Sequence, residues 1–320
     1  MLILGNGRVV TRNPECPYME EGAVAIDGKV ICKVGPTDEL KKAYPDAEFI
    51  DAKGGVIMPA FINTHEHIYS SFARGLAING YNPTGLLSIL EGMWWTLDRN
   101  LTLNDTYLSA MATYIDSIKN GVTTVFDHHA SFGAIKGSLF EIERAAKETG
   151  IRSCLCYEVS DRDGKDKARE SVMENAEFIR HALKDDSGMI AGMMGMHAQF
   201  TISDETMELA AANKPDEVGY HIHVAEGIED LLSVKAGFPM PCLSGIQSPS
   251  VGKTITIACS KKIPNFLEIR ASSVKAATVS DMHLSRFRIP ACIPFTAENN
   301  ATFGMPLRKW AQKRSSFCLD

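Results

Sequence analysis

Two His-x-His pairs carry the chemistry that this sequence could perform. His65 and His67 follow the apolar run 56–58, and His221 and His223 form a second pair far downstream. Residues two apart on a strand point to the same face, so both imidazoles of a pair can reach one metal ion. A bare pair also occurs in ordinary turns. The position after an apolar strand and the recurrence of the pattern favour a metal site.

The segments that must position these pairs alternate between apolar β-branched runs and helical periodicity. After a first strand ending near His67, strands are expected over 122–127, 151–157, 189–197 and 218–224. Helices are expected over 103–119, 134–149, 165–183 and 203–213. This alternation is typical of parallel βαβ units. The sequence therefore predicts an α/β fold.

Each expected strand ends in polar or ionisable side chains. These residues are His67, Asp127 with His128, Glu158, His197 and His223. A (β/α)₈ barrel collects its catalytic groups at the C-terminal ends of its strands, so the coincidence favours a TIM-type barrel. A doubly wound sheet is the alternative, but no Gly-rich phosphate loop follows the first strand.

The pattern divides the chain into three segments. Residues 1–55 predict a small β module, with a strand over 2–10, a hairpin over 22–31 and a short helix over 38–43. Residues 56–230 hold the first five β/α units. The pattern dissolves after about Gly227, and 231–320 keeps only one strand-like run, at 252–257.

Composition is that of an ordinary globular protein, with 45% hydrophobic and 22% charged residues in 320. No apolar run approaches the ~20 residues that span a bilayer, and no signal peptide is recognisable at the N-terminus. Eight cysteines without framework spacing indicate free thiols in a reducing compartment, here the cytoplasm. Cys154 and Cys156 are interpreted as core packing.

Charge is distributed unevenly along the chain. Residues 231–320 contain 12 Lys and Arg against 4 Asp and Glu, whereas residues 1–230 contain 21 against 35. A basic tail can bind nucleic acid, but these basic residues are scattered and lack interleaved aromatic residues. We therefore expect neither a nucleic acid nor a membrane as a partner.

Five stretches together resemble one family. They are PAFINTHEH at 59–67, SILEGMWW at 88–95, GVTTVFD at 121–127, CLCYEVSDR at 154–162 and HIHVAE at 221–226. The chain resembles the amidohydrolase superfamily, in the metal-dependent aminohydrolase branch that includes guanine deaminase, S-adenosylhomocysteine deaminases and chlorotriazine hydrolases. It is most similar to the SsnA-type aminohydrolases. The resemblance runs from residue 1 to about 230.

The resemblance implies a (β/α)₈ barrel with a small β-sandwich built from both chain ends, and one divalent metal ion, zinc first and iron as the alternative. Its metal ligands would include His65, His67 and His223. Glu226 matches the carboxylate that shuttles protons, and His197 matches a substrate-contacting histidine. Trp95 is a candidate for stacking on a planar substrate, although packing of a helix on the barrel would also account for it. Relatives commonly form homo-oligomers.

These residue types suit one reaction. Neutral imidazoles hold a metal that lowers the pKa of bound water from about 15.7 to roughly 7. The hydroxide attacks a carbon bearing a leaving amine, and a positioned carboxylate adds ~10²–10⁴ in rate by proton transfer. The predicted function is hydrolysis of a C–N bond in a purine-like ring, another N-heterocycle or an amidine. A hydrolase that expels chloride or an amide nitrogen is the alternative.

The family pattern also requires a His ending strand six and an Asp ending strand eight. The nearest candidate for the first is Ala258-Cys259, and no Gly-Thr-Asp-like strand end follows. We therefore interpret 231–320 as a divergent, out-of-frame or degenerate tail on an incomplete barrel. Turnover near background is predicted, and a catalytically inactive homologue is the corresponding alternative.

The remaining histidines receive structural interpretations. His221 lies two residues deeper than His223 and is interpreted as packed core. His128 and His129 are adjacent and must face opposite ways, so one can look into the barrel while the other is structural. His181 is expected to face solvent, and His283 is given no role.

Overall fold

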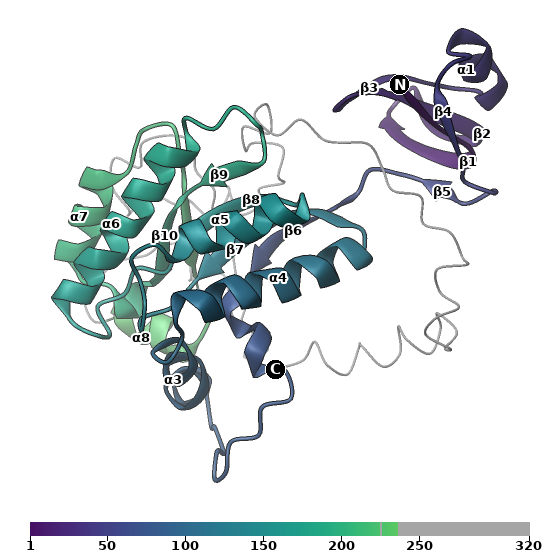
Figure 1. Cartoon of the computed structure of the whole chain (residues 1–320). Coiled ribbons are helices and arrows are strands. Elements are labelled where there is room, and N and C mark those ends of the chain that lie inside the picture. The colour runs from purple at the N-terminus through teal and green to yellow at the C-terminus, as the bar shows by residue number, and fades with distance from the viewer. Residues whose placement is uncertain (225, 236–320) are drawn as a thin grey trace. The chain divides into compact units, whose positions relative to one another are not determined.

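The computed structural model of the chain describes residues 1–224 and 226–235 (Figure 1). These residues fall into two compact units, one formed by Met1–Phe61 and the other beginning at Ile62. Each unit has hydrophobic clusters of its own. The predicted features of 236–320, including the run 252–257, Cys259 and His283, lie outside the described residues.

The first unit is a five-stranded sheet with one helix. Its elements are β1 (Leu2–Asn13), β2 (Cys16–Asp27), β3 (Val30–Gly35), α1 (Thr37–Ala43), β4 (Glu48–Asp51) and β5 (Val56–Ile57). The order is β3-β2-β1-β4, and β5 also pairs with β1. Gly28 turns the β2–β3 hairpin with a φ of 55°, a left-handed conformation that glycine adopts without steric cost. The second half of the predicted sandwich would come from the other chain end and stays a prediction.

The sequence predicts that the apolar run 56–58 begins the first barrel strand, and this prediction is wrong. Val56 and Ile57 instead pair in parallel with Arg8 and Val9 of β1. The strand that carries His65 is a separate one, β6 (Phe61–Glu66). Pairing with β1 buries Ile57 completely, which explains the apolar character of this run.

The second unit contains consecutive strands and helices in parallel arrangement. One sheet has the order β6-β7-β8-β9, with β7 (Val122–His129), β8 (Arg152–Tyr157) and β9 (Ile190–Gly192). A parallel pair follows, β10 (Met194–Ala198) and β11 (Tyr220–His223). The single strand predicted over 189–197 is thus two strands. They divide at Met193 because β9 pairs with β8 while β10 pairs with β11.

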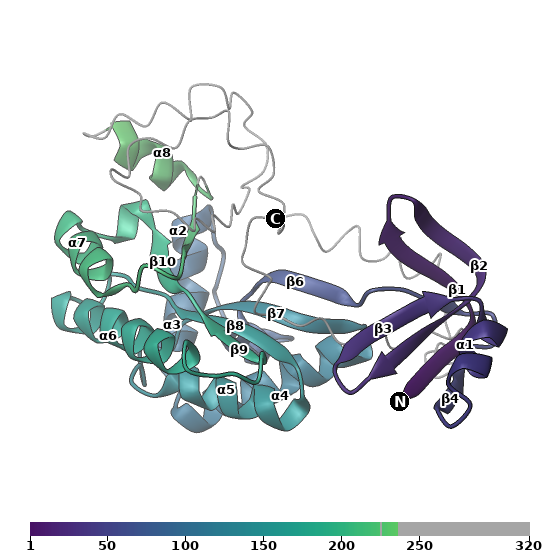
Figure 2. The ribbon, with the colours of Figure 1, turned by 90° about the horizontal axis from the view of Figure 1, so that it is seen from above.

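Four long helices cover one face of these strands. They are α4 (Leu103–Lys119), α5 (Ser138–Thr149), α6 (Lys165–Ala182) and α7 (Asp204–Asn213), and they lie side by side in Figure 2. Shorter segments are η1 (Ile68–Ala73), α2 (Leu86–Ile89), η2 (Leu90–Trp94), α3 (Trp95–Asp98), η3 (Gln199–Thr201) and α8 (Ile228–Lys235). None of the described helices has both the length and the apolar character needed to cross a membrane.

Local signals account for the helix ends. Thr102 and Asp105 form a reciprocal capping box at the start of α4. The predicted start of α5 at residue 134 is wrong, because Gly137 adopts a φ of 87° and interrupts the helix there. The carboxylate of Glu174 accepts hydrogen bonds from the backbone N–H groups of Gly137 (2.8 Å) and Leu139 (3.0 Å), which fixes the true start at Ser138.

The main core lies between these helices and the strands. Leu139 and Ile142 of α5 and Phe178 of α6 are fully buried together with Val125 and Leu155 of the strands. Burying each such side chain stabilises the fold by roughly 1.5–3 kcal/mol. The apolar face of each helix packs against the sheet, and the polar groups lie at the strand ends.

Candidate metal centre and substrate pocket

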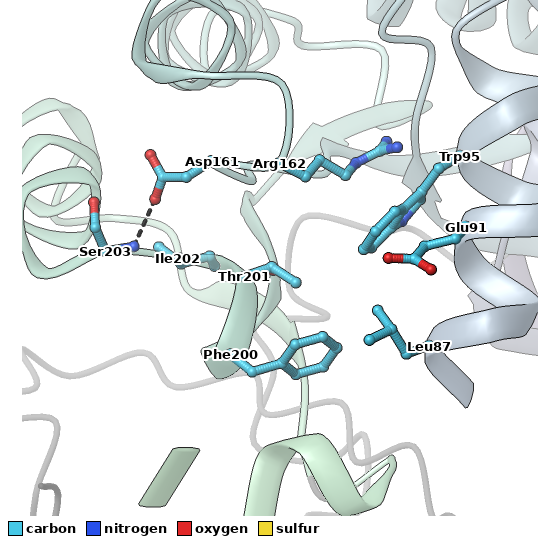
Figure 3. A pocket seen from close by; sticks show the side chains of 9 residues that line it. All are labelled: Leu87, Glu91, Trp95, Asp161, Arg162, Phe200, Thr201, Ile202 and Ser203. Carbon is cyan, nitrogen blue, oxygen red and sulfur yellow. Dashed lines mark hydrogen bonds between the residues drawn. The ribbon is translucent and has the colours of Figure 1, made fainter. Parts of the chain in front are cut away.

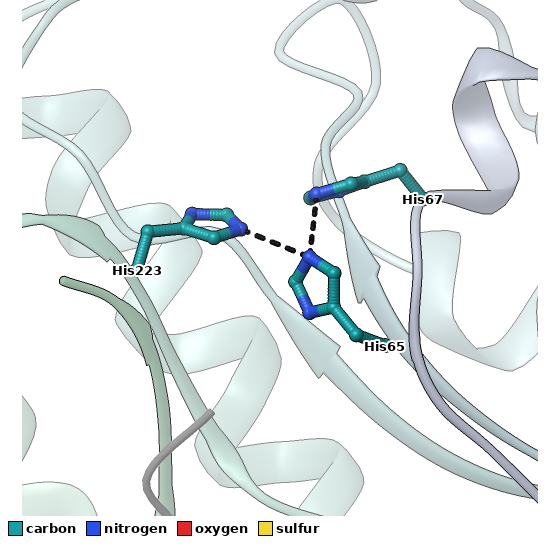
Figure 4. A group of neighbouring side chains, drawn as sticks. All are labelled: His65, His67 and His223. Atoms are coloured by element: carbon teal, nitrogen blue, oxygen red, sulfur yellow. Dashed lines mark hydrogen bonds between the residues drawn. The ribbon is translucent and has the colours of Figure 1, made fainter. Parts of the chain in front are cut away.

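Three histidines predicted as metal ligands converge at the strand ends (Figure 4). His65 lies in β6, His67 follows it directly, and His223 is the last residue of β11. The Nε2 atom of His65 is 3.1 Å from Nε2 of His67 and 3.3 Å from Nε2 of His223. This contact joins residues 158 positions apart, one from β6 of the four-stranded sheet and the other from β11, which pairs with β10.

The spacing of these nitrogens suits a metal ion. Tetrahedral zinc with Zn–N bonds of about 2.0–2.1 Å requires about 3.3–3.4 Å between ligand nitrogens. The two observed Nε2 separations, 3.1 and 3.3 Å, lie close to that value. His65, His67 and His223 are one of three donor groups of this kind among the described residues.

Hydrogen bonds and burial prepare the rings for coordination. Nδ1 of His67 lies 2.8 Å from the backbone carbonyl of His128, and because a carbonyl only accepts, Nδ1 must carry the proton. The lone pair on Nε2 of His67 then faces the other two rings. Burial lowers the pKa of His67 to about 3 and that of His223 well below its ordinary value, so both are neutral, as metal ligands must be.

His197, the predicted substrate contact, lies next to His223 at the end of β10. The two ring centroids are 5.6 Å apart. Nδ1 of His197 is 2.8 Å from Oγ1 of Thr201, whose own hydroxyl donates to the Ala198 carbonyl. Nδ1 must therefore donate, and Nε2 of His197 keeps a lone pair that can accept a hydrogen bond.

Figure 3 shows a pocket of about 580 Å³. The ring of Phe200, which lines it, has its centroid 5.9 Å from that of His197. Leu87, Glu91 and Trp95 from the α2–α3 segment face Phe200 and Thr201 across the pocket. The Trp95 ring is buried, and its centroid lies 6.2 Å from that of His197. The volume falls in the range of small-molecule sites, about 300–1,000 Å³. The position of Trp95 is compatible with its predicted stacking role.

A buried cluster of charged side chains lies at this pocket, whose lining includes Arg162. The sequence analysis did not predict this cluster. Arg162 forms an ion pair with Asp98, and its guanidinium lies 3.7 Å from Glu158 and 3.8 Å from the centroid of Phe132. Burial raises the pKa of Glu158 to about 7 despite that cation. The strand-end position of Glu158 was the available signal, but the partners come from segments 64 residues apart.

Glu226, the predicted proton shuttle, follows β11. Its backbone N–H donates to Oδ2 of Asp230, 2.9 Å away, which anchors the turn into α8. Burial, reinforced by the charges of Glu158 and Asp230, raises the pKa of Glu226 to about 7. A carboxyl group with a pKa near neutrality can both take up and release protons at physiological pH.

The interpretation of His221 as packed core needs correction. Nε2 of His221 lies 3.1 Å from Nδ1 of His65, and Nδ1 of His221 lies 3.4 Å from Sγ of Cys156. His221 is buried, as expected, but its ring belongs to the polar histidine cluster rather than to apolar packing. Cys156 packs as predicted in an apolar cluster with Phe126, Cys154 and Met193, and its thiol also reaches His221. Both pairings join strands whose contact cannot be read from spacing alone.

The other histidines behave as their positions suggested. The His128 ring joins the cluster, with its centroid 4.4 Å from that of His223. His129 faces the other way, and its Nε2 lies 2.9 Å from Oγ of Ser131. His181 is exposed on α6 and pairs with Glu143 at 2.9 Å.

Comparison with protein families gives two matches. Residues 56–276 match the amidohydrolase family, so the match includes part of 231–320. Residues 22–47 match the imidazolonepropionase-like composite domain of bacteria.

The chain is 29% identical over 235 residues to a 5′-deoxyadenosine deaminase of Methanosarcina mazei, covering 73% of this chain and 51% of the relative. A 5-methylthioadenosine/S-adenosylhomocysteine deaminase of Pelotomaculum thermopropionicum is 29% identical over 242 residues, covering 74% and 52%. The chain thus spans about half the length of these curated relatives.

Solved structures share the fold. Guanine deaminase of Escherichia coli superposes with a TM-score of 0.61 at 21% identity, covering 75% of this chain and 57% of that one. Atrazine chlorohydrolase of Arthrobacter aurescens TC1, complexed with zinc, gives a TM-score of 0.61 at 24% identity, covering 74% and 55%. The fold is of the TIM-barrel type, and the strands β6 to β11 lie among the described residues.

Proposed function

The chain belongs to the amidohydrolase family, and on that premise we propose that it is a metal-dependent hydrolase acting on a C–N bond of a ring or amidine substrate. One observation carries the proposal. The Nε2 atoms of His65, His67 and His223 converge at metal-ligand spacing, and the His197 ring connects this set to Trp95 of an aromatic-lined pocket, with ring centroids 5.6 Å from His223 and 6.2 Å from Trp95.

The three histidines would hold a divalent ion, with zinc favoured because imidazole nitrogens at tetrahedral spacing suit it. When bound, the ion supplies Lewis acidity and lowers the pKa of water from 15.7 to about 7. Glu226 lies three residues beyond His223 and would move a proton from the attacking water to the leaving nitrogen. Its pKa of about 7 supports that role.

The pocket would orient the substrate. Trp95 and Phe200 offer aromatic faces to a planar ring, and Nε2 of His197 can accept a hydrogen bond from a substrate N–H group. The curated relatives are named for deaminases of adenosine derivatives. We therefore favour a 6-aminopurine nucleoside or a similar aminated heterocycle as the substrate.

The test is ammonia release by the zinc-loaded 320-residue chain from 5′-deoxyadenosine and from guanine, repeated after zinc removal and with His67→Ala. Release that requires both zinc and His67 supports the proposal. Zinc binding through His67 without release supports the impaired reading of the sequence, in which 231–320 lacks the remaining ligands. Release that is indifferent to zinc and to His67 contradicts the proposed function.

A further inference from the structure

A second group of donors lies beside the candidate centre. His128 of β7, Cys156 of β8 and His221 of β11 are each no more than 1% exposed. The β7–β8 register pairs His128 directly with Cys156, so the two side chains lie on one face of the sheet. Sγ of Cys156 is 3.7 Å from Nδ1 of His128 and 3.4 Å from Nδ1 of His221.

These distances match the edges of a coordination tetrahedron. Zinc with one sulfur ligand at about 2.3 Å and nitrogen ligands at 2.0–2.1 Å places sulfur about 3.5–3.6 Å from each nitrogen. The two observed S···N separations, 3.4 and 3.7 Å, lie on either side of that value. The three donor atoms all lie within 4.8 Å of one another.

The cluster is incompletely satisfied by hydrogen bonds. The Cys156 thiol can donate to the Asp127 carbonyl at 3.3 Å and accept from His221. Nε2 of His128, however, is fully buried and has no hydrogen-bond partner within the described residues. The nearest carboxylate oxygen to it, from Glu158, is 3.9 Å away. An ion bound through Nδ1 of His128 would keep the ring proton on Nε2, on the side of the Glu158 carboxylate.

We propose that His128, Cys156 and His221 form a second, sulfur-containing metal site next to the His65–His67–His223 set. A thiolate with two imidazoles selects soft or borderline ions such as zinc, cadmium or copper(I) over magnesium or calcium. This inference rests on the second cluster alone and is independent of the proposed hydrolase activity.

Loading of this site has a defined proton balance. The metal–sulfur bond replaces the S–H bond of Cys156, and that proton leaves to solvent. His221 binds through Nδ1, so its Nε2 faces Nδ1 of His65 at 3.1 Å. If His65 were bound to the first ion through Nε2 and His221 to the second through Nδ1, the contact between Nδ1 of His65 and Nε2 of His221 would have room for only one hydrogen. His65 would then keep its proton as a neutral imidazole, and His221 would lose its proton and become an imidazolate. Filling the second site after the first therefore releases two protons.

The test is titration of the purified, metal-free 320-residue chain with Co²⁺, followed by absorption spectroscopy. A sulfur-to-cobalt charge-transfer band in the near ultraviolet is expected. It should disappear in Cys156→Ser and persist in Cys154→Ser, a matched control because Cys154 is buried on the same strand. It should also persist in His67→Ala, which disables only the first set.

The four cysteines in 236–320 make the variants essential, since a band alone does not identify its sulfur. A band that keeps its intensity in Cys156→Ser overturns the proposal, as does the lack of any band in the wild-type chain at two equivalents of Co²⁺. If Cys156→Ser fails to fold by circular dichroism, His128→Asn replaces it. There, Co²⁺ affinity for the sulfur-bearing site should fall more than tenfold, and unchanged affinity overturns the proposal.

Discussion

The two faces of the second unit are specified in different ways. On the helix side, α4 to α7 bury apolar side chains against the strands, and each helix carries its own local boundary signals. On the strand-end side, histidines from β6, β7, β10 and β11 converge over sequence separations of up to 158 residues. The first face stabilises the fold, whereas the second buries polar groups at a cost that the proposed metal ion would offset. Substitutions on the helix side should therefore change the free energy of unfolding but not zinc affinity, and substitutions at the strand ends should change zinc affinity or the metal-dependent rate but not the packing of the helices.

The largest effect is expected from Glu226→Gln on the strand-end side. Removing the proton shuttle should lower any metal-dependent rate by ~10²–10⁴, because proton transfer contributes about that much. Zinc affinity should not change, since Glu226 is not one of the three ligands. Ammonia release and zinc titration measure the two quantities, with Glu217→Gln in an exposed loop as the control. Equal losses in both variants would remove Glu226 from the mechanism.

Leu139→Ala probes the helix side. Leu139 is fully buried in the main core, so the cavity should reduce the free energy of unfolding by ~2–5 kcal/mol. Zinc affinity of the folded protein should be retained. Urea denaturation gives the first quantity, and Leu108→Ala, at a side chain that is 44% exposed, serves as the control. A matching loss of zinc affinity below the unfolding transition would show that the two faces are coupled.

Glu174, which caps α5, gives the helix side a pH dependence. Burial raises its pKa from 4.5 to about 7, above the value in the unfolded chain. The protonated Glu174 side chain therefore contributes fully to the free energy of unfolding below about pH 4.5. That contribution, up to ~3 kcal/mol, is lost as the pH rises through about 7. In Glu174→Gln this part of the pH profile of unfolding should flatten, whereas Glu208→Gln, at an exposed position of α7, should keep it. An unchanged profile in Glu174→Gln would contradict the assignment.

The smallest effect concerns the capping box of α4. Thr102→Ala removes the hydroxyl that accepts from the Asp105 backbone N–H and should lower the free energy of unfolding by about 1 kcal/mol. Thr102→Ser keeps the hydroxyl and should restore most of that loss. Thermal denaturation of the two variants side by side makes the comparison, and equal destabilisation would assign the effect to packing of the Thr102 methyl group instead.

The same contrast explains what the sequence could predict. The bounds of α4 were predicted correctly, because apolar periodicity and flanking signals are local. The start of α5 was not, since the left-handed Gly137 and its Glu174 partner belong to different helices. The division at Met193 also depends on which neighbouring strand each half meets.

At the strand ends, the His-x-His spacing predicted His65, His67 and His223 as candidate ligands, because a strand places alternate residues on one face, and the structure brings the three rings together. No comparable spacing in the sequence predicted the contacts of Arg162 with Asp98 and of Cys156 with His221. Each joins residues 64 or 65 positions apart. Cys156 and His221 meet only when β8 and β11 assemble, and Arg162 meets Asp98 only when the segment after β8 packs against α3.

The most direct test of the central claim is a zinc titration of the metal-free chain against a chromophoric chelator, comparing wild type with His223→Ala and His181→Ala. His181 is exposed on α6, so His181→Ala should bind zinc like the wild type. His223→Ala should lose more than the 10–100-fold in affinity that removal of a mere supporting residue costs. Equal affinity in all three proteins would contradict a metal centre at the ends of β6 and β11.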